Sequence, residues 1–593
     1  MATISLVSLN SKYIHSSLAP WYLKSQSEFS NDINVIEYTI NDKLDNIIED
    51  LYFKNSKYLF FSCYIWNIDL IIKISKDIKK INKNIVIVLG GPEVSYDIER
   101  IFRENNHIDF IIKGEGEVPF VKFVKNIFKS EKSKEKISGL YSRYSSEFEE
   151  YSDIYENLDE IISPYTNEML NSCNNKIIYF ESSRGCPFRC SYCLSSLQNS
   201  KVRFFSLKRV KEDIIRILDS NVNQIKFVDR TFNCNKKRFF DILEFVNELE
   251  RDINFHFEIS ANLIDDEVIE FLKFIKPGRI QFEIGIQSTN KDVLNAVDRN
   301  SLVENLLSNI EKLINLKNIH IHVDLITGLP YEDLKSFKNS FNDVYKLNAN
   351  KIQLGFLKLL KGTKIRKEYK QYGYRFKDYP PYEILFNDFI SYKEITELKN
   401  IEVLIDKYYN SKKFIYILEF IKENNLFKSP YELYKYLSKY YMDMGYKNIQ
   451  MSLNQRYKIF FEFLKKYLSK VNCKILSDIL KFDFLTSDNT KNIPSYFDRV
   501  YLKELRSIGI KSLKNDLNYL KISENDIKKG FHFELFEYEI VDDFGDFIFD
   551  ISNIIKGRNA IVFDYTKKSN INNYKFDKLK LSYESMEKIK NGK

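Results

Sequence analysis

Glycine is scarce in this chain, which has 18 glycines among 593 residues, or about 3%. A typical protein contains roughly 7% glycine, so we expect each remaining glycine to lie where a side chain would not fit. Cysteine is also scarce. The seven cysteines are an odd number without a regular spacing, which argues against a disulfide framework and indicates a reducing compartment.

Long apolar runs are missing as well. The beginning, MATISLVSLN, lacks the basic region, the apolar run and the cleavage site of a signal peptide. The most apolar stretch, from Tyr58 to Ile72, is interrupted by Ser62, Asn67 and Asp69 and is too short to span a bilayer. The 90 basic and 82 acidic residues are interspersed along the chain. We therefore expect a cytoplasmic protein without a membrane or nucleic-acid partner.

Hydrophobic residues make up 44% of the chain, and its length suggests three or four domains at about 150 residues each. In residues 1–130, apolar runs alternate five times with amphipathic segments. This alternation predicts an α/β domain with a doubly wound, flavodoxin-like parallel sheet, whose ligands would lie at the carboxyl ends of the strands. The five runs are TISLVSL, INVIEYTI, YLFFSCYIW, IVIVLGG and IDFIIKGEG.

A second series of six alternations follows a linker predicted at residues 131–175. It predicts a partial (β/α)6 barrel over residues 176–375, smaller than the eightfold barrel. Residues 376–593 are expected to form a mainly α-helical extension with a few strands, such as FHFELFEYEI and AIVFDYT. No motif in this extension indicates a function, and its many Tyr and Phe residues at helical spacing are expected to be core. The six runs of the barrel are KIIYFES, QIKFVDR, INFHFEIS, RIQFEIGIQS, IHIHVDLITG and KIQLGFLKLL.

Three cysteines, Cys186, Cys190 and Cys193, lie in the run SSRGCPFRCSYCLSS directly after the first strand of the second series. Three thiolates at this spacing on one loop can face a common metal centre, and Arg184 and Arg189 favour the thiolate form. A zinc site would need a fourth ligand, and no nearby histidine or cysteine supplies one. A 4Fe-4S cluster with three protein ligands leaves one iron open. A zinc site and a chance cluster of buried cysteines remain alternatives.

The spacing C-x-x-x-C-x-x-C, with an aromatic residue before the last cysteine, resembles that of the radical SAM enzymes. The resemblance implies that S-adenosyl-L-methionine chelates the open iron and that its reductive cleavage gives a 5′-deoxyadenosyl radical. The Gly-Gly-Glu run common after the second strand is replaced here by Asp-Arg-Thr, which leaves the ligand of the cofactor's amino group open. The residues that the resemblance assigns to S-adenosylmethionine are Tyr192, Asp229, Arg230, Glu283, Gln287, Ser288 and Ile326.

A doubly wound domain directly before such a barrel resembles the cobalamin-binding domain of the cobalamin-dependent radical SAM subclass. The loops that carry the resemblance are NSKYIHSS, SCYIWN, LGGPEVS and KGEGEVPF, and Trp66 is expected to line the corrin face. The Asp-x-His-x-x-Gly signature of a lower cobalt ligand is absent. His15 could ligate cobalt, could cap the following helix, or cobalt could lack a protein nitrogen ligand. The residues implied to contact cobalamin are His15, Ser62, Gly90, Gly91, Pro92, Glu93, Gly114 and Gly116.

Together these features predict an enzyme with a 4Fe-4S cluster, S-adenosylmethionine and cobalamin, which methylates or rearranges an unactivated carbon of an unknown substrate. A one-electron reductant such as flavodoxin or ferredoxin is its expected partner. One alternative is a radical SAM enzyme without cobalamin that modifies RNA or a metabolite. The other is a non-catalytic binding protein that a metal at the three cysteines stabilises.

Overall fold

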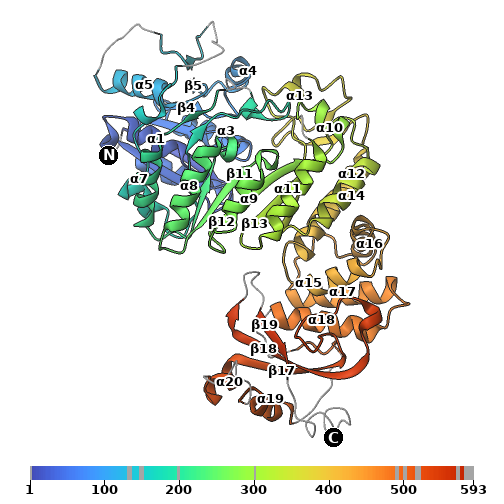
Figure 1. Cartoon of the computed structure of the whole chain (residues 1–593). Helices are drawn as coiled ribbons and strands as arrows, with labels where there is room; N and C mark the ends of the chain where they lie inside the picture. The colour runs from blue at the N-terminus through green and yellow to red at the C-terminus, as the bar shows by residue number, and fades with distance from the viewer. Residues whose placement is uncertain are drawn as a thin grey trace. The chain divides into compact units, whose positions relative to one another are not determined.

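The structure is a computed structural model that describes residues 3–129, 136–145, 153–196, 201–299, 302–487, 493–497, 504–514, 522–568 and 574–579 (Figure 1). The chain divides into two compact units. The first consists of Met1–Phe337 and Leu354–Ile395, and the second of Lys338–Gln353 and Thr396–Lys593. No described helix combines the length and the apolar character needed to cross a membrane.

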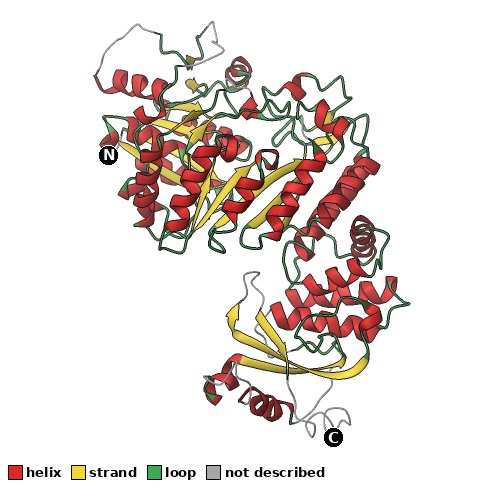
Figure 2. Cartoon of the chain, in the orientation of Figure 1, coloured by secondary structure: helices red, strands yellow, loops and turns green. Residues whose placement is uncertain are grey.

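The first unit begins with a six-stranded sheet in the order β2-β1-β3-β4-β5-β6. Figure 2 draws strands in yellow and helices in red. The five runs predicted from the sequence form β1 to β5, which pair in parallel. The sixth strand, β6, pairs antiparallel with β5 and comes from the predicted linker. The strands are β1 (Ile4–Asn10), β2 (Ile33–Thr39), β3 (Tyr58–Ser62), β4 (Val86–Gly90), β5 (Phe110–Ile112) and β6 (Leu140–Ser142).

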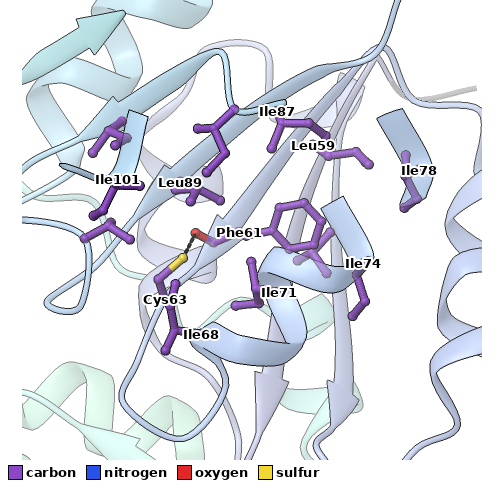
Figure 3. Packing of buried hydrophobic residues seen from close by; sticks show 14 of the residues in the cluster. Leu59, Phe61, Cys63, Ile68, Ile71, Ile74, Ile78, Ile87, Leu89 and Ile101 are labelled. Atoms are coloured by element: carbon purple, nitrogen blue, oxygen red, sulfur yellow. Dashed lines mark hydrogen bonds between the residues drawn. The ribbon is translucent and has the colours of Figure 1, made fainter. Parts of the chain in front are cut away.

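Helices cover both faces of this sheet, as the doubly wound prediction requires. On one face, Ile71, Ile74 and Ile78 of α3 recur at helical spacing and pack into one cluster with Leu59 and Phe61 of β3 (Figure 3). On the other face, α5 packs its buried apolar residues against the same strands. The helices are α1 (Ala19–Gln26), α2 (Leu44–Lys54), α3 (Ile68–Ile81), α4 (Ile98–Glu104) and α5 (Glu117–Lys129).

The second sheet has the order β14-β13-β12-β11-β10-β7, so that its strands follow one another in chain order and do not close into a ring. This confirms the predicted partial barrel of six strand and helix units. The strands are β7 (Ile178–Phe180), β10 (Gln224–Phe227), β11 (Asn254–Ile259), β12 (Ile280–Gln287), β13 (His320–Thr327) and β14 (Lys351–Phe356). The intervening helices are α7 (Leu207–Leu218), α8 (Lys236–Glu248), α9 (Asp266–Leu272), α10 (Lys291–Ala296), α11 (Val303–Asn315) and α12 (Leu334–Lys346).

Burial alternates along the strands of this sheet. In β12 every second residue, from Ile280 to Ile286, is buried, and the residues between them are only half-buried. Helix α7 begins at a Ser206 cap, whose hydroxyl oxygen accepts the Arg209 backbone N–H at 3.2 Å. The apolar side chains of the strands therefore form the core with the helices, and the polar side chains face the inside of the partial barrel.

Short elements connect the two sheets and follow the second one. The predicted linker at 131–175 lies partly outside the described residues, and its described part includes β6 and α6. A hairpin of β8 and β9, which the sequence did not predict, encloses the cysteine loop. These elements are α6 (Asn167–Ser172), β8 (Ser183–Arg184), β9 (Arg203–Phe204), α13 (Lys364–Lys367), β15 (Arg375–Phe376) and β16 (Ile384–Phe386). The 3-10 helices are η1 (Ser30–Asp32), η2 (Leu158–Glu160), η3 (Leu194–Ser196), η4 (Phe232–Cys234), η5 (Ala261–Leu263) and η6 (Ile551–Asn553).

The C-terminal region is mainly helical and includes a three-stranded antiparallel sheet of order β17-β18-β19. Its tyrosines form core as predicted, because Tyr408, Tyr431, Tyr434 and Tyr457 are fully buried. The helices are α14 (Tyr392–Tyr408), α15 (Ile415–Glu423), α16 (Pro430–Asp443), α17 (Leu453–Tyr467), α18 (Cys473–Ser487), α19 (Leu505–Lys514) and α20 (Glu524–Gly530). The strands are β17 (Phe531–Tyr538), β18 (Lys556–Lys568) and β19 (Tyr574–Lys578).

Candidate cofactor site

A cavity of about 570 Å³ lies in the first unit and is lined by loops of both sheets. The first sheet contributes the loops after β3, β4 and β5. The second contributes the segments after β7, β10 and β14. These are the carboxyl ends of the strands, where ligands of such sheets are expected. Seven of the eight residues predicted to contact cobalamin line this cavity, namely Ser62, Gly90, Gly91, Pro92, Glu93, Gly114 and Gly116.

The eighth residue, His15, does not line the cavity. Its Nδ1 atom lies 2.8 Å from the Tyr179 hydroxyl oxygen, and its backbone forms a parallel bridge with Ile177. Burial and the charge of Lys12 lower the pKa of His15, so the ring is neutral at pH 7. The loop after β1 thus runs along the β7 edge of the second sheet instead of toward the cavity.

Two features shape the cavity wall on the side of the first sheet. Gly91 has φ +110°, and a β-carbon there would lie 2.6 Å from the Cys63 carbonyl oxygen, so only glycine allows the loops after β3 and β4 to approach this closely. The rings of Tyr64 and Trp66 both line the cavity and stack with centroids 4.5 Å apart and planes 3° apart. The Trp66 indole N–H donates to the Leu9 carbonyl at 3.1 Å, which fixes this flat aromatic surface.

A buried network of charges joins the loop after β5 to the segment before the cysteines. Arg184 donates to Glu115 at 2.7 Å, Glu117 at 2.7 Å and Glu181 at 3.0 Å, and all four side chains are at most 15% exposed. Arg203 also pairs with Glu115. Although burial opposes it, the charge of Arg184 lowers the pKa of Glu117, whereas burial raises the pKa of Glu181. Three carboxylates thus share two guanidinium groups beside the cavity.

Glu93, which was predicted to contact cobalamin, has protein partners. Its carboxylate accepts from the Lys361 ammonium at 2.7 Å and from the Tyr382 hydroxyl. Lys361 also lines the cavity. The loop after β4 is therefore tied to the segment that follows β14, and both segments belong to the first unit.

The three cysteines lie together on the loop enclosed by β8 and β9. Cys186 and Cys190 are buried and Cys193 is half-buried. A turn joins the last two, with the Cys193 N–H donating to the Cys190 carbonyl at 3.1 Å, while the Cys186 sulfur lies 3.4 Å from the Thr231 hydroxyl oxygen. Among the described residues, no three His, Cys, Asp or Glu side chains converge closely enough to hold a metal ion. The donors available, three thiols without a carboxylate or imidazole, nevertheless fit an iron–sulfur cluster.

Backbone hydrogen bonds clamp the middle of the cysteine loop from two sides. The Ser191 N–H donates to the Val297 carbonyl at 3.0 Å, and the Ser191 carbonyl accepts from the Ile365 N–H at 3.0 Å. The partners follow α10 and begin α13. The loop is therefore fixed by the second sheet's own connections.

Asp229 and Arg230, which were predicted to contact S-adenosylmethionine, differ in their surroundings. The Asp229 carboxylate accepts hydrogen bonds from the Ser182 N–H at 3.0 Å, the Ser182 hydroxyl at 2.7 Å and the Ser183 hydroxyl at 2.5 Å. Burial raises its pKa. Asp229 thus holds the segment before the cysteines. Arg230 lines the cavity, and its guanidinium lies 4.0 Å from Glu258.

Two further predicted residues also have protein partners. Glu283 pairs with Lys226 at 3.2 Å and with His256 at 2.9 Å, and these groups lower its pKa against the effect of burial. The Ser288 hydroxyl donates to Glu332 at 2.6 Å. Ile326, which was also predicted to contact S-adenosylmethionine, is a half-buried apolar residue near the end of β13.

Arg299 is a residue of this site that the sequence did not predict. Its guanidinium donates to the Gly285 carbonyl, and Nη1 lies 3.8 Å from the Cys190 sulfur. Gln287 folds over the same glycine, where a β-carbon would lie 2.1 Å from the Gln287 amide nitrogen. Tyr192 and Cys190 raise the pKa of Arg299 against the effect of burial, which places Tyr192 in the same group. Arg299 is 109 residues from Cys190 in the sequence, and no motif marks it.

Three family models match successive parts of the chain. The B12 binding domain matches residues 4–124, the radical SAM superfamily residues 180–344, and a protein family of unknown function, DUF4080, residues 370–563. The first match covers the sheet that lines one side of the cavity, and the second covers the cysteine loop and most of the second sheet. These matches assign the chain a [4Fe-4S] cluster, S-adenosylmethionine and cobalamin as its cofactors.

Two curated relatives are methyltransferases by name. The cobalamin-dependent radical SAM methyltransferase TokK of Streptomyces tokunonensis is 25% identical over 54% of this chain and 49% of its own length. The 2-(S-pantetheinyl)-carbapenam-3-carboxylate methyltransferase of Streptantibioticus cattleyicolor is 24% identical over 54% of this chain and 50% of its own length. The chain thus spans about half the length of these two relatives.

Two solved structures share the fold. The cobalamin-dependent S-adenosylmethionine radical enzyme OxsB, with aqua-cobalamin and S-adenosylmethionine bound, has a TM-score of 0.59 and 15% identity, and the match covers 82% of this chain and 79% of that one. TsrM from Kitasatospora setae, with cobalamin and a [4Fe-4S] cluster bound, has a TM-score of 0.51 and 14% identity over 64% and 78% of the two chains. The chain therefore has the domain composition of the cobalamin-dependent radical SAM family: a B12 binding domain, a radical SAM domain and a DUF4080 region.

Proposed function

We propose that this protein is an enzyme that methylates, or otherwise rearranges, an unactivated carbon of its substrate. The observation that supports this most directly is a cavity lined both by the glycine-containing loops of the first sheet and by the segment that leads into the cysteine loop. When bound, the cluster and S-adenosylmethionine supply a 5′-deoxyadenosyl radical and cobalamin supplies a methyl group. A shared cavity would let both groups act on one substrate carbon.

The residues of the chain have separate roles in this proposal. Cys186, Cys190 and Cys193 would hold the cluster. The glycines after β4 and β5 leave room for a large ligand, and the stacked rings of Tyr64 and Trp66 offer it a flat apolar surface. Arg184 and Lys361 in the cavity wall form ion pairs within the protein, which holds this part of the wall in place.

Methyl transfer is the favoured outcome because TokK and the carbapenam-3-carboxylate enzyme are both named methyltransferases. The substrate of this chain is not specified by these names. The electron that reduces the cluster would come from a one-electron donor such as flavodoxin or ferredoxin, and we place the reaction in the cytoplasm, where such donors and reduced thiols occur.

Anaerobic reconstitution with iron, sulfide and hydroxocobalamin tests the proposal. The holoenzyme should show corrin absorption at one equivalent per chain and should release 5′-deoxyadenosine from S-adenosylmethionine under a strong reductant. Cys193→Ala should abolish this release. Cys473→Ala is the matched control, because Cys473 is an exposed cysteine in the second unit. Corrin absorption that stays well below one equivalent would refute the cobalamin claim, and equal release by both variants would refute the cluster claim.

A further inference from the structure

Arg230 is an exposed cation between two buried neighbours in the loop after β10. Asp229 and Thr231 are buried, whereas the Arg230 side chain is 56% exposed and lines the cavity. The Asp229 carboxylate accepts the Ser182 N–H at 3.0 Å, and the Thr231 hydroxyl oxygen lies 3.4 Å from the Cys186 sulfur. The backbone is therefore fixed on both sides of Arg230, and the guanidinium is presented to the cavity.

The guanidinium of Arg230 has only a weak protein partner. Among the described residues, the one carboxylate within ion-pair distance belongs to Glu258 of β11, and its oxygen lies 4.0 Å away, which is beyond hydrogen-bond distance. The other two cations that line the cavity, Arg184 and Lys361, form ion pairs at 2.7 Å and are at most 14% exposed. Of these three cations, Arg230 is the one that can bind an external anion.

Arg230 lies close to both sheets of the first unit. Burial raises the pKa values of Tyr64 and Glu258, and in both cases the charge of Arg230 opposes this effect. Tyr64 belongs to the loop after β3 of the first sheet and stacks on Trp66, whereas Glu258 belongs to the second sheet. An anion bound to Arg230 would thus lie in the part of the cavity that the two sheets share.

We propose that Arg230 binds an anionic group of the substrate, a carboxylate or a phosphate, and thereby holds the reacting carbon in the shared cavity. The inference rests on the proposed function, because it assumes that the substrate occupies this cavity. A guanidinium can donate two parallel hydrogen bonds to either group. It has no hydrogen-bond acceptor, so Arg230 cannot bind the amino group of S-adenosylmethionine.

Ligand-observed NMR of the anaerobic holoenzyme tests the inference, with the cluster, methylcobalamin and S-adenosylmethionine bound and no reductant present. The probes are inorganic phosphate, followed by its phosphorus linewidth, and acetate, followed by saturation transfer, with acetamide as the neutral match of acetate. The unsubstituted protein should bind at least one of the two anions saturably and more tightly than acetamide. Arg230→Gln should weaken this binding about tenfold or more, because it removes a hydrogen-bonded charge, and Arg230→Lys should weaken it less.

Two further variants serve as controls. Arg216 of α7 is also 56% exposed and lies 3.6 Å from Asp213, but it is not among the residues that line the cavity. Arg216→Gln therefore deletes the same charge and should leave anion binding unchanged. Glu258→Gln should act in the opposite direction to Arg230→Gln, because it removes the negative charge beside Arg230 and anion binding should become tighter.

The outcomes separate this inference from the proposed function. Equal binding of the anions and acetamide by the unsubstituted protein, or equal anion binding by Arg230→Gln and Arg216→Gln, would refute the inference. Anion binding that disappears when S-adenosylmethionine is added would also refute it, because the carboxylate of the cofactor would then occupy Arg230. If Arg230→Gln does not take up its cofactors, Glu258→Gln decides: tighter anion binding supports the inference and unchanged binding refutes it. Failure of the proposed function would show instead as missing corrin absorption or missing 5′-deoxyadenosine release in the unsubstituted protein.

Discussion

The network around Arg184 predicts a large loss of stability when its central charge is removed. In Arg184→Met the side chain keeps a similar length, but the contacts to Glu115, Glu117 and Glu181, at 2.7, 2.7 and 3.0 Å, are lost. Of the three carboxylates, only Glu115 retains a cation, Arg203. Glu117 and Glu181 are then buried without a cation at ion-pair distance, and only the more distant charge of Arg203 still acts on Glu117.

Arg184→Met should lower the free energy of unfolding by about 3–5 kcal/mol, which is typical when one partner of a buried ion pair is deleted. Arg184→Lys should recover only a part, because an ammonium is a point charge and does not bridge three carboxylates as a guanidinium does. The stability lost in Arg184→Met should also become smaller as the pH falls from about 8 to about 5. Without Arg184 the pKa values of the buried carboxyls lie above their unfolded values, so the folded variant takes up protons as the pH falls and gains stability.

Urea unfolding of the cofactor-free protein measures this effect, since both tryptophans of the chain, Trp21 and Trp66, lie in the first sheet's domain and report its unfolding. Lys24→Met is the control. Lys24 donates to Glu168 at 2.7 Å, but Glu168 is 59% exposed, and such pairs contribute at most about 1 kcal/mol. A midpoint for Arg184→Met no lower than that for Lys24→Met would refute the reasoning.

Three further predictions concern single positions. Gly91→Ala should lower cobalamin occupancy in reconstituted protein, because the β-carbon would lie 2.6 Å from the Cys63 carbonyl oxygen at φ +110°; normal occupancy would show that the two loops separate easily. His15→Ala should leave the visible spectrum of bound cobalamin unchanged, since His15 contacts Tyr179 outside the cavity, and a spectral shift would indicate cobalt ligation. Burial raises the pKa of Asp483 to about 8. Because this exceeds the unfolded value, thermal stability should fall as the pH rises from about 5 to 8. Asp483→Asn should flatten that slope, and an unaltered slope would contradict the assignment.

The fold and the strand-end loops that line part of the cavity could be predicted from the sequence because they depend on local patterns. Apolar runs that alternate with amphipathic segments specify parallel strands with covering helices, and the carboxyl ends of such strands meet on one edge. Ser62 ends β3, Gly90 ends β4 and Gly114 follows β5, yet this rule alone places them at one cavity. The cysteine loop was predictable for the same reason, since it directly follows a strand.

The contacts that the sequence did not reveal join segments far apart in the chain. Arg184 meets Glu115 and Glu117 across 69 and 67 residues, and although both carboxylates lie in the KGEGEVPF loop, nothing in that motif indicates Arg184 as their partner. His15 lies in a strand-end loop, so position alone suggested a cobalt ligand. The loop that contains His15 leads away from the cavity because its backbone pairs with Ile177 at the edge of the second sheet. An unpaired sheet edge readily binds an extended segment. Edge pairing of this kind has no local sequence pattern.

Gly91 and Gly285 show how much can be inferred from the scarcity of glycine in this chain. The shortage predicts that something occupies the space of each missing side chain. The structure agrees at Gly91 and Gly285, whereas at Gly278 and Gly445 a β-carbon would meet nothing within 4 Å. At Gly91 the obstacle is the backbone of the neighbouring loop, which the strand order implies. At Gly285 the obstacle is the Gln287 side chain, whose amide nitrogen would lie 2.1 Å from a β-carbon, and no spacing implies this contact. A glycine therefore marks a close approach in advance of the structure, but the group that approaches is known only when the packing is known.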